Sequence, residues 1–251
     1  MQSKLVEAIA LASSPVAVIL TNAKPEAALQ FKEGGWGCVA ATMLAVSKGK
    51  IAVFDRQSYG CPGGGVGLGF GNTYEQRCFA IDKLLSTGDP EAAKQYRSGS
   101  HMAEGERFMK SPELVRQWLS RLPITEVPTE YVVMKPLDLI SEADPPELVV
   151  FLVNPDQLSA LIVITDFSRG RGEAAIAPYG GSCQSVLYGY AEAARDVPRG
   201  VLGFFDIAQR HRVPRDILSY TVPWKLFLQM EADVEDSFLE LGDWKELRQR
   251  Q

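Results

Sequence analysis

Residues 147–153 read Glu-Leu-Val-Val-Phe-Leu-Val, and residues 15–20 read Pro-Val-Ala-Val-Ile-Leu. Uninterrupted apolar runs of this length, rich in β-branched residues, are typical of strands buried on both faces. Each run is followed, at a distance, by a Gly-rich turn, a cysteine, a helix of small residues and another strand. The sequence therefore predicts an α/β (or α+β) fold that contains these two runs as buried strands.

The segments that follow the two runs resemble each other. Residues 37–56 and residues 181–206 both pass from a Gly-flanked cysteine, through a second glycine, to a strand followed by aspartate. We expect a single compact domain over residues 1–251, built from two similar β/α halves, 1–125 and 126–251, with a shared cleft. A duplicated fold would place the two cysteines at equivalent helix starts. A chance resemblance between two short patterns is the alternative.

The other elements follow from apolar spacing, caps and glycine or proline breaks. Asn154 and Pro155, for example, form a favourable helix start. We expect helices at residues 3–11, 38–46, 73–85, 111–122, 154–167 and 224–241, and strands at residues 51–54, 130–134, 174–177, 201–205 and 217–222.

Composition excludes several classes of protein. The net charge of −5 argues against nucleic acid as a partner, because no stripe of Lys and Arg is present to contact phosphates. The apolar runs are shorter than the ~20 residues of a membrane helix. The N-terminus, Met1–Glu7, lacks the features of a secretion signal. We therefore expect a cytoplasmic protein, in which the four cysteines serve as thiols, metal ligands or catalytic groups rather than disulfides.

The most unusual segment is Cys61-Pro-Gly-Gly-Gly-Val-Gly-Leu-Gly-Phe-Gly71. Glycine occupies every odd position from 63 to 71, so an extended chain would have one face of bare backbone with the cysteine at its head. Gly63, Gly64, Gly65 and Gly67 are candidates for contact with a ligand on that face. Close packing beneath a helix is the alternative reason for the glycines. The spacing does not match a nucleotide-binding motif.

Three cysteines, Cys38, Cys61 and Cys183, lie in Gly-rich turns. A helix N-terminus favours thiolate, and thiolates bind zinc and iron–sulfur clusters. Three thiolates on a [4Fe-4S] cluster would leave one iron open, whereas structural zinc requires a fourth ligand such as His101 or His211. The alternative is that these cysteines are small buried apolar residues, as we expect for Cys78.

Two pairs of charged residues are further candidates for ligand binding. Asp55 and Asp206 follow apolar strands, where α/β folds place ligand-binding groups, although turn and cap roles are equally consistent with their positions. Arg56 and Arg210 lie close in sequence to these aspartates and are candidates to bind an anionic ligand, or to form surface ion pairs.

The order of these motifs resembles the DUF169 (ArCR) family of uncharacterised proteins from archaea and anaerobic bacteria. The resemblance covers roughly residues 5–240, and its most specific part is Gly60-Cys61-Pro-Gly-Gly with Leu68-Gly69-Phe70. Cys38, Cys61 and Cys183 correspond to cysteines in the family pattern. The resemblance implies an anaerobic setting, which favours an oxygen-sensitive cluster, but it implies no reaction.

Three functional hypotheses remain open at this point. The first is an iron–sulfur protein, most simply with a [4Fe-4S] cluster held by the three cysteines in a central cleft, with zinc as the alternative metal. The second is a metal-free protein that binds a small molecule, or an enzyme with a reactive cysteine beside the glycine-rich strip. The third is a partner protein that forms a homodimer through the helix at residues 224–241. The sequence specifies neither a substrate nor a redox partner.

Overall fold

The computed structural model describes residues 1–95, 99–141 and 143–250, which form two compact units. The first unit combines residues 1–71 with the chain from residue 125 onward, and the second comprises residues 72–124. Helices combined with a mixed sheet confirm the predicted α/β (or α+β) class. No helix in the described ranges is long and apolar enough to cross a membrane.

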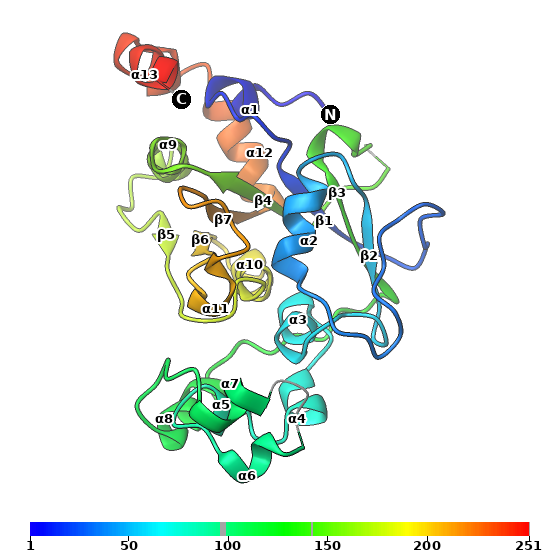
Figure 1. Cartoon of the computed structure of the whole chain (residues 1–251). Coiled ribbons are helices and arrows are strands. Elements are labelled where there is room, and N and C mark those ends of the chain that lie inside the picture. The colour runs from blue at the N-terminus through cyan, green and yellow to red at the C-terminus, as the bar shows by residue number, and fades with distance from the viewer. Residues whose placement is uncertain (96–98, 142, 251) are drawn as a thin grey trace. The chain divides into compact units, whose positions relative to one another are not determined.

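The first unit contains a seven-stranded sheet with the order β2-β3-β1-β4-β7-β6-β5 (Figure 1). All neighbouring strands pair antiparallel except β5 and β6, which are parallel. The strands are β1 (Val16–Thr21), β2 (Ala52–Phe54), β3 (Tyr131–Pro136), β4 (Leu148–Val153), β5 (Ala175–Ile176), β6 (Gly200–Gly203) and β7 (Leu218–Pro223). β1 and β4 lie side by side, with Val16 opposite Val150. Both apolar runs are therefore buried strands, as predicted.

Alternate residues of these two strands enter two different cores, because side chains alternate across a sheet. Val18 and Val150 belong to one apolar cluster, and Ile19 and Phe151 belong to the other. Burying each such side chain contributes about 1.5–3 kcal/mol relative to an exposed one. Helices on both faces thus explain why the runs are apolar without interruption.

Two sets of helices supply these cores. On one face are α2 (Val39–Val46), α3 (Pro62–Leu68) and α10 (Gln184–Ala193), and the other core takes side chains from α1 (Lys4–Ala8), α9 (Pro155–Asp166), α12 (Trp224–Asp233) and α13 (Gly242–Leu247). Shorter elements are α11 (Ile207–Arg210), η1 (Leu137–Leu139), η2 (Phe238–Glu240) and η3 (Arg248–Arg250). The start of α9 matches the sequence prediction, since Asn154 and Gln157 form a reciprocal capping box.

The glycine-rich segment is a helix, and the extended conformation considered from its period of two is wrong. Helix α3 begins after Cys61 with Pro62 in its first turn and ends at Gly69, which has a left-handed φ of 84°. Gly67 shows why the segment needs glycine: a Cβ there would lie 2.6 Å from the carbonyl oxygen of Cys183, at the start of α10. Glycine is therefore needed here because two helices approach each other closely, and not because a strand has a bare face.

Two other predicted helices are interrupted. The expected helix at residues 73–85 divides into α4 (Thr73–Arg77) and α5 (Ile81–Leu84), with Cys78 at the end of α4. The expected helix at residues 224–241 ends at Asp233, and a short 3₁₀ turn, η2, follows. Helix ends depend on tertiary contacts that apolar spacing does not encode.

The second unit is helical throughout its described ordered elements. It contains α4, α5, α6 (Pro90–Ala93), α7 (Gly99–Glu104) and α8 (Pro112–Leu119), and Ala80, Ala92 and Met102 form a small core. The chain leaves and re-enters the first unit at one place, since the Gly71 N–H donates to the Thr125 carbonyl oxygen at 3.1 Å. Residues 72–124 are therefore an insertion with adjacent ends.

The strand order is the same on both sides of the central pair. Outward from β1 lie β3 and β2, and outward from β4 lie β7 and β6, with β5 added at that edge. Helix α2 precedes β2, and helix α10 precedes β6. Divided in this way, the first half would contain β3 and so extend past residue 125, the boundary expected from the sequence; a duplication stays a prediction.

Candidate functional site

Cys38 lies immediately before α2, at the N-cap position of that helix. Its backbone is extended, with φ −111° and ψ 113°, but its side chain makes no capping hydrogen bond. Instead, the partly buried thiol donates to Oε1 of Gln209 at 3.3 Å. Cys38 is therefore at a helix start, as predicted, with its sulfur turned toward another segment of the chain.

Cys61 is the N-cap residue of α3, and its sulfur accepts a hydrogen bond from the Gly64 N–H at 3.3 Å. Its own N–H donates to the carbonyl oxygen of Gly37 at 3.2 Å. That bond brings the start of α3 beside the residue that precedes Cys38. Two of the three candidate cysteines are thus neighbours, although 22 residues lie between them in sequence.

Cys183 is the N-cap residue of α10, and its thiol donates to the Gly63 carbonyl oxygen, in the first turn of α3, at 3.1 Å. The residue is buried, with 8% of its surface exposed. The bond joins sequence positions 120 residues apart. All three cysteines therefore lie at the starts of helices that meet in one region.

Burial and neighbouring acidic groups raise the pKa values of two of these thiols. Burial raises the pKa of Cys183 well above its usual value, and Cys61, Cys38 and Asp206 raise it further. Burial also raises the pKa of Cys61, against the effect of the Gly64 N–H, and Cys38 adds to the increase. In the absence of a positive charge, Cys61 and Cys183 therefore favour the thiol form.

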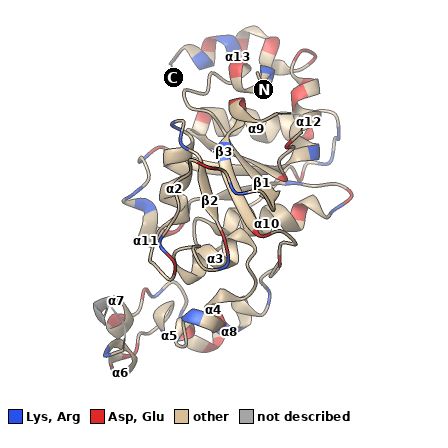
Figure 2. Ribbon diagram, turned by 90° about the vertical axis from the view of Figure 1, so that its right-hand side faces the viewer, with Lys and Arg blue, Asp and Glu red and all other residues tan. Residues whose placement is uncertain are grey.

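Few charges surround the three thiols on their own helices. Helices α2, α3 and α10 are drawn mostly in tan in Figure 2, the colour of uncharged residues. They contain one charged residue among them, Glu192, near the far end of α10. Glu192 is itself paired, because Arg199 donates to its Oε1 at 2.7 Å. The thiols therefore have no Lys or Arg on these helices to balance a thiolate.

The loop after β6 brings polar groups to the same region. Asp206 caps α11 by accepting from the Ala208 N–H at 3.0 Å, and Gln209, in that helix, accepts from Cys38. Burial raises the pKa of Asp206. Asp206 is a candidate from the sequence, whereas Gln209 is not, because its one signal is its position three residues after the aspartate.

A search among known proteins identifies the family but no function. The model of the DUF169 family, described as uncharacterised ArCR, matches residues 4–233. The chain belongs to the DUF169 family. No curated protein matches this DUF169 chain, and no solved structure matches it.

Like Asp206, the other three charged candidates of the DUF169 chain bind its own backbone. Asp55 Oδ1 accepts from the N–H groups of Gln57 and Ser58 at 2.9 and 2.8 Å and so stabilises a turn. Arg56 donates to two backbone carbonyl oxygens of the loop at residues 127–129. Arg210 donates to carbonyl oxygens within residues 214–217. The contacts of these three side chains are structural, and their role toward a ligand stays a prediction.

The four candidate glycines make different contacts in the fold. Gly63 supplies a carbonyl to Cys183 and Gly64 supplies an N–H to Cys61, so the α3 backbone contacts both thiols. Gly67 permits the close approach to α10. Gly65 is buried within α3. Glycine thus lets the backbone of α3 reach the sulfurs, and contact of these glycines with a ligand stays a prediction.

The two histidines considered as zinc ligands belong to different parts of the fold. His101 belongs to α7 of the inserted unit, and His211 follows α11 and is exposed. Across the residues that the structure describes, no three His, Cys, Asp or Glu side chains are grouped to hold one metal ion. Cys78 is buried in the inserted unit, as predicted for a core cysteine.

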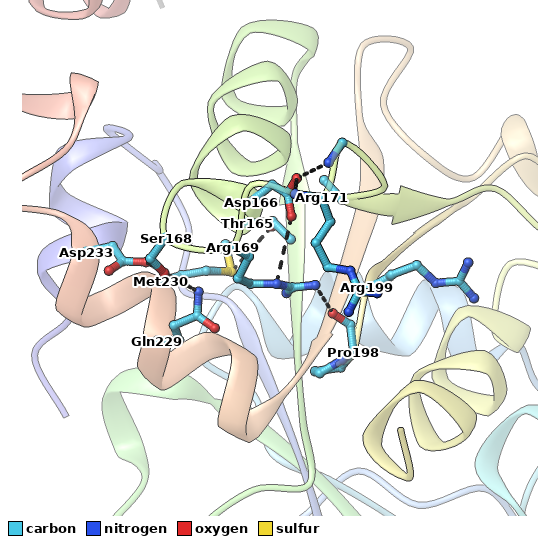
Figure 3. Close-up of polar contacts among 12 residues, drawn as sticks. Thr165, Asp166, Ser168, Arg169, Arg171, Pro198, Arg199, Gln229, Met230 and Asp233 are labelled. Atoms are coloured by element: carbon cyan, nitrogen blue, oxygen red, sulfur yellow. Dashed lines mark hydrogen bonds and ion pairs between the residues drawn. The ribbon is translucent and has the colours of Figure 1, made fainter. Parts of the chain in front are cut away.

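A separate hollow of about 450 Å³ near the end of α10 is lined by charged residues: Arg169, Arg171, Arg195, Arg199, Glu173 and Asp196. Figure 3 shows Asp166 with Arg169 and Arg171, and Arg169 donates to the Pro198 carbonyl oxygen at 2.7 Å. Asp166 and Glu192 form ion pairs with Arg169 and Arg199. Together with Glu173 and Asp196 they give four acidic groups, which equal the four arginines in number. The balanced charges favour an internal ion network over an anion-binding site.

Proposed function

We propose that this protein binds a [4Fe-4S] cluster through Cys38, Cys61 and Cys183. The observation that carries the proposal is the convergence of three helix starts, each with a cysteine at its N-cap. The donor set fits such a group, because iron–sulfur clusters take thiolate ligands and backbone N–H groups that donate to sulfur. Each cysteine would bind a different iron, so the ligands need not surround one point as they do around zinc.

The choice of residue at these caps also supports the proposal. Ser, Thr, Asp and Asn are favoured at N-caps, and this chain uses Ser3, Ser111 and Asn154 in that way. Cys38 and Cys183 make no capping hydrogen bond. A cysteine that adds no capping hydrogen bond to its helix is well explained by a role as a metal ligand.

A metal-free reactive cysteine is less well supported. A nucleophilic cysteine needs a lowered pKa, whereas burial raises the pKa values of Cys61 and Cys183. Bound iron would supply the positive charge that stabilises the thiolates. When bound, the cluster would supply electron transfer, or an iron open to an added ligand.

The test is metal analysis of protein purified without oxygen. We expect a brown protein with about four irons per chain and matching acid-labile sulfide. Replacing Cys38, Cys61 or Cys183 by alanine should lower the iron content and bleach the colour. Cys78→Ala is the matched control, since Cys78 is a buried cysteine of the inserted unit, and it should retain the iron.

Two results would reject the cluster. Colourless, metal-free wild-type protein from cells grown without oxygen would contradict metal binding altogether. One zinc per chain without sulfide would show that the site binds zinc and not an iron–sulfur cluster.

A further inference from the structure

Asp206 lies near Cys183, and one of its carboxylate oxygens caps α11. Oδ1 accepts the capping hydrogen bond from Ala208 at 3.0 Å. A Cβ built on Gly181 would lie 3.8 Å from Asp206 Oδ2 and 3.8 Å from Cys183 Sγ. The oxygen and the sulfur therefore border the same small space, which exists because residue 181 has no side chain.

The backbone before Asp206 is held in a strained conformation. Phe204 has a φ of 68°, which is unusual for a bulky residue, and its side chain is completely buried. Strain of this kind persists where surrounding packing enforces it, and it gathers at functional sites. The buried ring thus fixes the direction in which the chain leaves β6 and so positions Asp206.

The same loop contacts the site at a second point. Gln209, in α11, accepts the hydrogen bond from Cys38, whereas Asp206, at the start of that helix, couples electrostatically to Cys183. Residues 206–209 therefore extend from one proposed ligand to another. A carboxylate on this loop is well placed to take part in binding the group that those cysteines hold.

We infer that Asp206 is the fourth ligand of the cluster and binds, through Oδ2, the iron that has no cysteine. This inference rests on the proposed function. A carboxylate is a harder ligand than a thiolate and suits the iron less well. The bond to Asp206 is therefore the one that an incoming anionic ligand exchanges, and the iron it holds is the one most easily lost.

The test follows the loss of one iron on mild oxidation. Ferricyanide is added to anaerobically purified protein, and conversion to a three-iron cluster is followed by electron paramagnetic resonance and iron analysis. Asp206→Ala should release the iron on the order of tenfold faster than wild type, and Asp206→Cys should release it more slowly by a similar factor.

Two further variants separate ligation from folding. Asp206→Asn keeps the cap on α11, because Asn caps a helix as well as Asp, yet it should also release iron faster. Asp89→Ala is the control, since Asp89 caps α6 in the inserted unit, and it should release iron at the wild-type rate.

The outcomes distinguish the two proposals. Wild-type protein without a cluster overturns the proposed function and the inference together. A four-iron cluster that Asp206→Ala, Asp206→Asn and Asp206→Cys all release at the wild-type rate overturns the role of Asp206 and leaves the cluster in place.

Discussion

Cys38 has the extended backbone of a good N-cap but no capping hydrogen bond. Sulfur is a weak acceptor, so a hydroxyl at this position would satisfy the first turn of α2 better. Cysteine at position 38 therefore stabilises the start of α2 less than serine would, which indicates that another property of the thiol is needed here. Such conflicts between stability and function are common at sites that bind or react.

We predict that Cys38→Ser stabilises the iron-free protein while removing its capacity to hold the full cluster. A serine hydroxyl should cap α2, which is worth about 0.5–1 kcal/mol in the free energy of unfolding. Urea unfolding of the iron-free forms measures the gain, and iron analysis measures the loss. Cys78→Ser is the control, because it lies outside the site and should give no gain. A destabilised Cys38→Ser protein would contradict the role assigned to the cap.

At the scale of elements, α3 and α10 pack closely against each other in the site. Gly67 faces the Cys183 carbonyl, and Cys183 in turn donates to the Gly63 carbonyl. The start of α10 thus meets α3 both near its first residues, at Gly63, and near its last, at Gly67. The spacing between Cys61 and Cys183 depends on this contact.

We predict opposite outcomes for two glycine-to-alanine substitutions. Gly67→Ala would place a Cβ 2.6 Å from the Cys183 oxygen and should cost about 1–3 kcal/mol, as overpacking does. Gly181→Ala places its Cβ at 3.8 Å from its neighbours, so the free energy of unfolding should change by less than about 0.5 kcal/mol. Thermal unfolding of the iron-free proteins tests both, and equal effects would contradict the packing described here.

At the scale of the whole molecule, residues 72–124 form a compact unit of their own. The backbone enters and leaves it at Gly71 and Thr125, which share a hydrogen bond. The three cysteines, Asp206 and Gln209 all belong to the other unit. The site therefore needs no residue from the insertion for its ligands.

We predict that a chain with residues 72–124 replaced by a short glycine linker still folds and still binds iron. The linker has little distance to span, so its closure costs little. A single cooperative urea transition and an iron content equal to that of the full chain are the expected results. The same deletion in a Cys61→Ala protein is the control for iron binding. An unfolded product would show that the insertion stabilises the rest of the chain.

The sequence alone determined the features that depend on local pattern. Apolar runs identified β1 and β4 as buried strands, Asn154 and Pro155 marked the start of α9, and the glycine-flanked cysteines marked the candidate site. These features can be predicted from the sequence because burial on two faces, helix capping and backbone freedom depend on residues that are close together in the chain.

Only the tertiary structure decided the conformation of residues 62–68 and the composition of the site. A period of two in glycines is normally read as a strand, but glycine has no side chain, so its pattern records the room that a neighbour needs. The approach of Gln209 to Cys38, and of Cys183 to Gly63, joins positions 171 and 120 residues apart. Such contacts arise from sheet order and helix packing, which are properties of the folded chain as a whole.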